Sequence, residues 1–379
     1  MAKARILVVD DEAGMLRSME RILAPQHDVV AHRMPADAIA TARDGSFDVA
    51  ILDVRMPGMD GFDLMATLKA GQPDLDVILM TGSVHEADAR LIRAIKERAF
   101  FFLTKPFDRD VLLALVSRCL ELRRANADNR QHVERLEQEL RAAQRFQTSL
   151  MPPNRVRQGR VVIEARYVPW AQLGGDFYDC APARGEGAVL LIVDVSGHGA
   201  SAAMLTGMVK LAFRDALLRD DEPAEILYRI AASRTTFPEG QYLTALCARI
   251  DPARGRIDWV NAGHPPGLIA QRSGGLVQLA TTAPIVHPVF GRWECETRSE
   301  AFVPGDKVLL YTDGVTECRR AGETDDDPAA EQFGLERLEA ALAERAREPI
   351  ETILARLSAF QAGRPLEDDV AMILGKIEA

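Results

Sequence analysis

The sequence has no long hydrophobic run, few cysteines and no excess of basic residues. None of its apolar runs reaches the roughly 18 residues that a membrane-spanning helix needs. The five cysteines are scattered and include no Cys-x-x-Cys pair, which fits reduced thiols better than a disulfide framework or a zinc site. A net charge of −10 argues against a general nucleic-acid binder. The apolar run at residues 6–9 is too short for a signal peptide, so we expect a cytoplasmic protein without membrane or nucleic-acid partners.

Length and composition predict a protein with several ordinary globular parts. The 379 residues, 47% of them hydrophobic and 27% charged, suffice for two or three domains that each bury a core. Changes of pattern along the chain place the boundaries. We expect one domain at residues 1–118, a helical linker at 119–152 and a second domain at 156–379.

The first segment alternates strand and helix patterns. Apolar runs occur at residues 6–9, 49–52, 77–80 and 100–103, with a weaker one at 28–31. Helical patterns lie between them, for example at residues 13–23 and 86–99. This alternation predicts an α/β domain with a parallel sheet covered on both faces, whose ligands sit beyond the carboxyl ends of the strands.

Charged and hydroxyl side chains stand at those strand ends, namely Asp10, Asp11, Asp53, Thr81 and Lys105. Three carboxylates at one point repel each other unless a cation lies among them, and oxygen ligands suit Mg²⁺. A lysine and a hydroxyl beside them can hold a phosphoryl group.

These motifs resemble the flavodoxin-like receiver domain of response regulators. The resemblance covers residues 5–118 and rests on ILVVDDE at 6–12, LDVRMPGMDG at 52–61, MTG at 80–82 and LTKPF at 103–107. It implies that Asp53 accepts a phosphoryl group from a cognate sensor histidine kinase. One Mg²⁺ would be bound by Asp11, Asp53 and the backbone carbonyl of Arg55, with Asp10 in support.

The same resemblance assigns the remaining receiver positions. Thr81 and Lys105 would contact the phosphoryl oxygens. The aromatic switch position falls on Phe102, which offers no phenolic hydroxyl. The bond between Lys105 and Pro106 is a candidate cis peptide, since a tertiary amide lowers the cis penalty.

The linker has apolar residues at alternating spacings of three and four. Counted from Leu122, they are Val133, Leu136, Leu140, Ala143 and Leu150, with Asn126, Asn129 and Gln147 at intervening seam positions. We expect one helix to continue from residues 108–118 through the linker and to end at the proline pair 152–153. The spacing favours a parallel coiled-coil homodimer that transmits the state of the receiver. A solvated helical spacer in a monomer remains the alternative.

The C-terminal segment places four acidic turns beside strands. Asp176 follows two glycines, Asp194 ends the apolar run 189–193, Asp313 follows the strand pattern 307–311, and Asp368 precedes another at 370–374. We expect an α+β layered domain with these acids at one edge. Buried carboxylates need a partner, and no histidine or cysteine pattern with zinc spacing accompanies them, which points to Mg²⁺ or Mn²⁺. Two such ions about 3.5–4 Å apart can share a carboxylate and activate water for attack on phosphorus.

This segment resembles the PPM-type metal-dependent protein phosphatases, in their bacterial stress-response and sporulation branch. The motifs are GGDFYD at 174–179, DVSGHG at 194–199, NAGH at 261–264, YTDGVTE at 311–317 and EDDV at 367–370. The resemblance implies a β-sandwich with flanking helices. Asp194 would bridge two ions and the Val195 carbonyl would ligate one; Asp176 would bind the second ion, and Asp313 and Asp368 the first. Asp369 is the neighbouring alternative to Asp368.

Three other features of this segment have less direct roles. His198 is a candidate proton donor, although a turn-stabilising role fits its glycine neighbours better. Asn261 and His264, followed by two prolines, are expected to shape a hairpin. Residues 317–332 show no core pattern and are expected to form a mobile surface loop.

Together these features predict a two-component response regulator whose output is a protein phosphatase. By the resemblance, its substrate is a phosphoserine or phosphothreonine protein, namely a phosphorylated anti-sigma-factor antagonist, and phosphorylation of Asp53 gates the reaction. The alternative is a non-catalytic adaptor that binds a sigma factor or its antagonist through a phosphatase-like domain. All expected acid positions are filled, which favours the enzyme.

Overall fold

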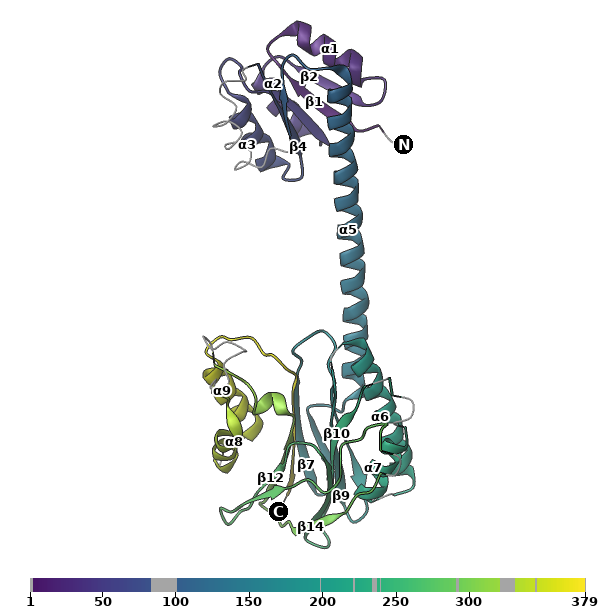
Figure 1. Ribbon diagram of the computed structural model, residues 1–379. Helices are drawn as coiled ribbons and strands as arrows, with labels where there is room; N and C mark the ends of the chain where they lie inside the picture. Colours follow the sequence, from purple (N-terminus) through teal and green to yellow (C-terminus); the bar gives the residue numbers. More distant parts are fainter. Residues whose placement is uncertain are drawn as a thin grey trace. The chain divides into compact units, whose positions relative to one another are not determined.

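A computed structural model describes residues 3–82, 101–197, 199–220, 222–233, 237–238, 240–290, 293–320, 331–344 and 346–378. The chain divides into two compact units, Met1–Leu136 and Glu137–Ala379, which are described separately below (Figure 1). In the part that the structure describes, no helix is both long enough and apolar enough to span a bilayer.

The first unit is a parallel five-stranded sheet in the order β2-β1-β3-β4-β5. The strands are β1 (Arg5–Val9), β2 (Asp28–His32), β3 (Val49–Asp53), β4 (Asp76–Thr81) and β5 (Phe101–Thr104). This order and the parallel pairing confirm the predicted flavodoxin-like α/β fold. The helix expected at residues 86–99 falls outside the described residues.

Helices cover both faces of this sheet because the side chains of its buried strands alternate between two cores. Leu7, Leu52 and Leu79 pack with α2 (Pro35–Asp44) and α3 (Gly61–Gly71). Their neighbours Val8 and Ile51 pack with α1 (Ala13–Leu23) and the first turns of α5 (Arg109–Leu150). The apolar runs in the sequence are therefore continuous because both faces of each strand are buried.

Helix α5 confirms the predicted uninterrupted helix that stops before the proline pair. Its first turns are buried in the receiver core, whereas its side chains from residue 124 to 143 are exposed. Val133, Leu136 and Leu140 are among them, at 48%, 58% and 40% exposure. The coiled-coil pairing of this stripe stays a prediction. Gln147 does not belong to it, since this side chain is buried against its own chain.

The second unit contains two antiparallel sheets with helices on their outer faces. One sheet has the order β14-β11-β10-β9-β8 and the other β13-β12-β15-β16-β7-β6. The strands are β6 (Arg155–Gln158), β7 (Val161–Val168), β8 (Asp176–Ala183), β9 (Gly187–Val195), β10 (Leu243–Asp251), β11 (Arg256–Ala262), β12 (Gly267–Ala270), β13 (Leu276–Leu279), β14 (Arg298–Ala301), β15 (Lys307–Tyr311) and β16 (Val370–Ile377).

The layers follow from which residues of each strand are buried together. α6 (Ala200–Leu218) and α7 (Pro223–Ala232) pack on the sheet that contains β9 and β10. α8 (Gly334–Ala343) and α9 (Pro349–Gln361) pack on the outer face of the sheet that contains β15 and β16. Figure 1 shows the two helix pairs on opposite sides of the sheets. The predicted layered sandwich with flanking helices is confirmed.

The predicted hairpin at Asn261 and His264 is wrong. β11 pairs with β10 and β14, whereas β12 pairs with β13 and β15, so the segment between them crosses from one sheet to the other. The turn-forming residues signalled a change of direction correctly. They carried no information about which strand would be the next partner.

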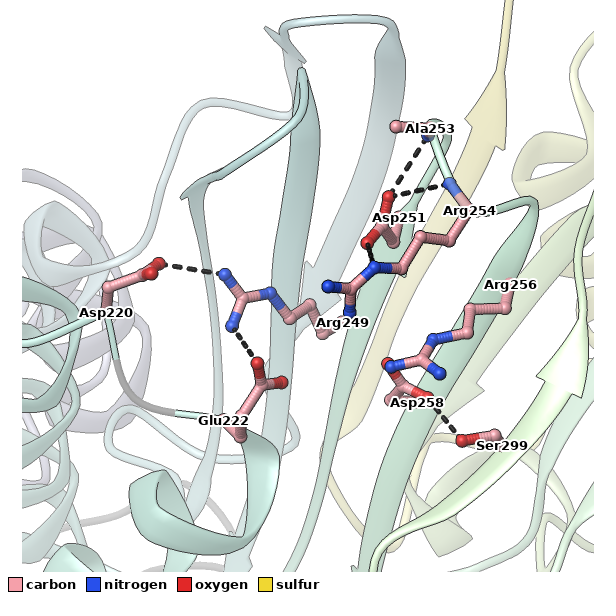
Figure 2. A network of polar contacts seen from close by, with 9 residues as sticks. All are labelled: Asp220, Glu222, Arg249, Asp251, Ala253, Arg254, Arg256, Asp258 and Ser299. Atoms are coloured by element: carbon pink, nitrogen blue, oxygen red, sulfur yellow. Dashed lines mark hydrogen bonds and ion pairs between the residues drawn. The ribbon is translucent and has the colours of Figure 1, made fainter.

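An ionic network lies at the end of β10 remote from Asp194 (Figure 2). Arg249, only 6% exposed, contacts Asp220 at 2.8 Å and Glu222 at 2.9 Å, which belong to the connection between α6 and α7. Asp251 accepts the backbone N–H groups of the turn that leads to β11. This end of the sheet is thereby tied to the helices that cover it.

Candidate metal centres

The receiver acids meet at the carboxyl end of the parallel sheet. Asp10 follows β1 and Asp53 ends β3, and with Asp11 they place carboxylate oxygens within 4.8 Å of one another. Lys105, which follows β5, lies 2.7 Å from Asp10 and 3.0 Å from Asp53. The structure therefore brings these four predicted residues together.

Burial and charge set the protonation of this site. Burial raises the pKa of Asp53, although Lys105 opposes the shift. Burial also works to lower the pKa of Lys105, but its hydrogen bonds to Asp10 and Asp53 outweigh this and raise it. The lysine remains cationic, yet three carboxylates face one ammonium group. The remaining negative charge and the oxygen-only donors fit a hard divalent cation such as Mg²⁺.

The other predicted receiver residues lie on β4, on β5 and in the segment after β3. Thr81 is 4% exposed at the end of β4, and its carbonyl accepts the N–H of Lys105 at 2.7 Å. Phe102 lies half-buried within β5, beside the core that also packs α2 and α3. Arg55 is exposed, in the segment after β3. The Lys105–Pro106 bond is cis, which confirms the sequence prediction.

In the second unit, Asp176 and Asp194 stand directly opposite each other on neighbouring strands. Asp176 begins β8 and Asp194 is the penultimate residue of β9, and the two are register partners. Residues opposite each other in an antiparallel pair project from the same face of the sheet. Both carboxylates therefore leave the sheet on one side, at one end of the sandwich.

The second sheet supplies the other acids at this end. Asp313 begins a short 3₁₀ turn one residue after β15, and Asp368 and Asp369 directly precede β16, the partner of β15. Asp194 is repelled electrostatically by Asp313, Asp368 and Asp369. The four predicted turns thus converge from two different sheets.

The carboxylates of this cluster bind protons unusually tightly. Burial, then Asp194, raises the pKa of Asp176 well above its ordinary value, against a hydrogen bond from Thr312. Burial, then the charge of Asp313, raises the pKa of Asp194 to about 7. Burial and Glu317 likewise raise the pKa of Asp313. Burial and the neighbouring carboxylates both disfavour the charged forms of these acids.

One carboxylate oxygen of Asp176 is left without a hydrogen-bond partner in the part of the chain that the structure describes. Its Oδ2 is buried and has no hydrogen-bond partner among the described residues. A buried carboxylate oxygen without a partner costs free energy that a cation would recover. No trio of these acids, within the described ranges, comes as close together as the receiver trio.

Close contacts between chain segments explain why glycines occupy three positions at the end of the sandwich that carries the acids. A Cβ atom on Gly175 would overlap the carbonyl oxygen of Val195, and one on Gly174 would overlap the carboxylate of Asp369. A Cβ on Gly314 would overlap the carbonyl of Asp369. The glycines let four chain segments approach within contact distance, which brings the Val195 carbonyl to the same place as the acids.

Asp368 and Asp369 differ in their surroundings. Asp369 is 4% exposed and accepts hydrogen bonds from the N–H of Trp170 at 2.9 Å and the hydroxyl of Tyr167 at 3.3 Å. Asp368 accepts the backbone N–H of Asp369 at 2.7 Å and lines a cavity of about 150 Å³ with Arg319 and other residues. Asp369 therefore holds the segment before β8, while Asp368 is exposed and lines the cavity.

Two sequence expectations fall wholly or partly outside the described residues. His198 is not described, although its neighbours Gly197 and Gly199 both have positive φ angles. Of the predicted surface loop, residues 321–330 are likewise outside. Its described ends are anchored, since Cys318 is 8% exposed and the backbone of Arg319 pairs with that of Gln332 in an isolated antiparallel β-bridge.

Sequence reasoning missed Gln147 as a residue of this site. The side chain is 3% exposed, its amide N–H donates to the Gly174 carbonyl at 2.7 Å, and its Oε1 accepts the Gly174 N–H at 3.4 Å. Both polar groups of Gly174, two residues before Asp176, are therefore held by the last turns of α5. The only sequence signal for Gln147 was its place in the heptad pattern, which predicted a position in a coiled-coil seam.

Replacing Gln147 with leucine should lower the free energy of unfolding of the second unit by about 1–3 kcal/mol, because leucine leaves the N–H and C=O of Gly174 buried without partners. Urea unfolding would measure the change. Gln138→Leu is the matched control: Gln138 is exposed on the same helix, and its replacement should change stability by less than about 0.5 kcal/mol. Equal effects of the two substitutions would contradict this role.

Comparison with known proteins gives two family matches. The family described as Stage II sporulation protein E (SpoIIE) matches residues 184–378, just over half of the chain, and the response regulator receiver domain matches residues 6–117. The phosphoserine phosphatase RsbP of Bacillus subtilis is 32% identical over 183 residues, 47% of this chain and 45% of RsbP. The transcriptional regulatory protein FixJ of Bradyrhizobium diazoefficiens is 37% identical over 115 residues, 30% of this chain and 55% of FixJ.

A solved structure supports the fold of the second unit. The SiaA-PP2C domain of Pseudomonas aeruginosa superposes with a TM-score of 0.56 and 20% identity, covering 65% of this chain and 98% of that domain. At this identity the likeness concerns the fold alone. The chain spans between about a quarter and about half of the length of the curated relatives that it matches.

Proposed function

Because the chain belongs to the SpoIIE family and carries a response regulator receiver domain, we propose that it is a response regulator whose output is metal-dependent hydrolysis of phosphoserine or phosphothreonine in a protein. The observation that carries the proposal is the pairing of Asp176 and Asp194 at a buried end of the sandwich, where the negative charges of Asp313 and Asp368 also act on Asp194. The likeness to the phosphoserine phosphatase RsbP supports the substrate chemistry.

The acids have distinct roles in this proposal. Asp194, repelled by acids of the opposite sheet and paired with Asp176 in its own, is the carboxylate best placed to be shared between two ions. Asp176 and the Val195 carbonyl would complete one side of the site, and Asp313 and Asp368 the other. Asp369 is buried and accepts hydrogen bonds from Trp170 and Tyr167, whereas Asp368 lines the cavity, which favours Asp368 as the ligand.

The chemistry would be attack of water on the phosphorus of a phosphomonoester. When bound, a pair of Mg²⁺ or Mn²⁺ ions supplies Lewis-acid polarisation of the phosphoryl group and of the attacking water. The carboxylates of this chain would hold and orient that pair, with Asp176 buried in the sandwich and Asp368 exposed beside the cavity. The cavity beside Asp368, with Arg319 on its wall, offers a place for the phosphorylated side chain.

The receiver would control this output through Asp53. A sensor histidine kinase would donate the phosphoryl group, one Mg²⁺ would lie among Asp10, Asp11, Asp53 and the Arg55 carbonyl, and Lys105 and Thr81 would contact the phosphoryl oxygens. Phe102 would take the switch position.

Helix α5 connects the two functions. Its first turns lie in the receiver core, and near its other end Gln147 holds Gly174, two residues before Asp176. A homodimer formed through Val133, Leu136 and Leu140 would make the helix responsive to receiver state, and a monomeric spacer is the alternative. Coupling between distinct sites typically reaches about 1–3 kcal/mol, or roughly 5–150-fold.

The deciding experiment measures release of phosphate from a phosphorylated anti-sigma-factor antagonist, with Mn²⁺, with Mg²⁺ and with a chelator. Each arm is run with and without a small acyl phosphate donor. We expect turnover only with a divalent ion and a rate that changes when Asp53 is phosphorylated. A non-catalytic adaptor would show no turnover and no binding of a metal pair by calorimetry.

A further inference from the structure

The segment that crosses between the two sheets holds a histidine rigidly in the interior. His264 is 3% exposed. Its backbone N–H donates to Oδ1 of Asn261 at 2.8 Å, and its carbonyl accepts the amide of the same Asn261 at 3.0 Å. Asn261 also donates to the carbonyl of Leu279 at 3.1 Å, which anchors the crossing to the second sheet. The backbone that carries the imidazole is therefore held in one position.

Both ring nitrogens of His264 have partners, and the partners determine the tautomer. Nε2 lies 3.0 Å from the carbonyl oxygen of Tyr311, and Nδ1 lies 2.8 Å from the hydroxyl of Thr244. A carbonyl oxygen can only accept, so Nε2 must carry the proton. Nδ1 is then an acceptor, and the Thr244 hydroxyl donates to it. Burial lowers the pKa of His264 to about 3, so the ring stays neutral at physiological pH.

The two partners of the ring belong to different sheets and adjoin the candidate metal acids. Thr244 is the register partner of Asp194 on the neighbouring strand β10. Tyr311 ends β15, and the next two residues are Thr312, which hydrogen-bonds Asp176, and Asp313. One neutral ring therefore connects the strand beside Asp194 to the chain that delivers Asp313.

We propose that His264 is a positioning residue that sets the separation of Asp194 and Asp313 by bridging Thr244 and the Tyr311 carbonyl. The inference rests on the proposed metal-dependent function. Carboxylates that share two ions must be held to within about 0.5 Å, and these acids lie on sheets that could otherwise shift relative to each other. Through His264, the crossing segment joins the two sheets next to Asp194 and Asp313.

Thr244 offers the sharpest test, because its hydroxyl can be removed without changing its shape. The primary measurement is Mn²⁺ binding by isothermal titration calorimetry on the full-length chain. We expect Thr244→Val to bind Mn²⁺ about 10- to 100-fold more weakly, the usual effect of removing a group that orients metal ligands. Thr244→Ser keeps the hydroxyl and should retain most of the affinity. Phosphatase activity of Thr244→Val should recover at high Mn²⁺ concentration, since the acids themselves remain.

His264 is tested with two partial mimics. His264→Gln keeps a donor for the Tyr311 carbonyl but loses the bond to Thr244, and His264→Asn keeps an acceptor for Thr244 but loses the bond to Tyr311. Because each variant breaks the link between the two sheets, each should weaken Mn²⁺ binding. Nitrogen-15 spectra of the parent imidazole report the tautomer independently of metal. We expect a protonated Nε2 and a bare Nδ1 at pH 7.

Ile353→Val separates positioning from general stability. Ile353 lies on the buried face of α9, against the outer face of the sheet that contains β15 and β16, so its truncation should lower the urea midpoint without weakening Mn²⁺ binding. Parent-like Mn²⁺ affinity in Thr244→Val, or a protonated Nδ1, overturns the inference. If Ile353→Val weakens binding as much as Thr244→Val, the role of His264 is only structural, and the inference again fails. A parent that binds no Mn²⁺ and releases no phosphate overturns the proposed function together with it.

Discussion

Replacing Asp194 with asparagine is expected to abolish phosphatase turnover and Mn²⁺ binding while the fold survives. Asp194 is the carboxylate that faces Asp176 in its own sheet and is repelled by Asp313 and Asp368 of the other, so both ions would lose a ligand at once. An amide of the same shape carries no charge and binds divalent cations weakly. Phosphate release and calorimetric Mn²⁺ titration would measure the loss.

The same substitution should stabilise the protein when metal is absent. Burial and neighbouring carboxylates raise the pKa of Asp194 to about 7 in the folded state, from about 3.9 for an ordinary aspartate. The folded state therefore holds this proton more tightly than the unfolded state. Stability is lost as the pH rises from about 4 to about 7, and the loss is complete above that range.

The size of this effect is limited by solvent. A shift of this size corresponds to about 4 kcal/mol at most, and partial exposure of Asp194 reduces it. We expect metal-free Asp194→Asn to exceed the metal-free parent by about 1–2 kcal/mol in free energy of unfolding at pH 8, with no difference near pH 4. Added Mn²⁺ should stabilise the parent alone.

Asp251→Asn is the matched control for this substitution. Asp251 lies at the remote end of β10 and caps the turn before β11, a role that asparagine also fills. Turnover and Mn²⁺ binding should stay at the parent level. Full activity in Asp194→Asn would refute the metal mechanism, because both ions of the proposed pair depend on this carboxylate.

Replacing Asp53 with asparagine is expected to reduce labelling by an acyl phosphate donor from near one phosphoryl group per chain to background. Asp53 ends β3 among Asp10, Asp11 and Lys105, and the lysine is held 3.0 Å from its carboxylate. A carboxylate oxygen can attack phosphorus, whereas a neutral amide cannot. Mass spectrometry of the intact chain would measure the labelling, and removal of Mg²⁺ should suppress it in the parent.

This substitution should also remove the response of the phosphatase to the donor, a change of roughly 5- to 150-fold if the coupling is typical. Asp60→Asn serves as the control, since Asp60 caps α3 by accepting the N–H of Asp63 at 2.8 Å and asparagine caps equally well. The control should be labelled like the parent. Labelling of Asp53→Asn at the parent level would place the phosphoryl group on another residue.

Several features of the molecule followed from local sequence. The apolar runs of the receiver became parallel strands, and Asp10, Asp53 and Lys105 were found together because parallel strands deliver their carboxyl ends to one edge. Helix α5 ended before the proline pair, as backbone chemistry requires. The acidic turns of the second domain were located because each adjoins a strand.

Other features depended on contacts between residues far apart in the chain. The crossing that holds Asn261 and His264 looked like a hairpin because turn residues specify a change of direction but no pairing partner. Gln147 looked like a seam residue because heptad spacing does not reveal which part of a helix is covered by its own chain. The raised pKa of Asp194 arises only when acids from two sheets are buried together. Sequence by itself determined the elements and their chemical groups, since propensity and periodicity act over a few residues. Tertiary structure alone decided which groups share a buried site, since burial and charge interaction act through space.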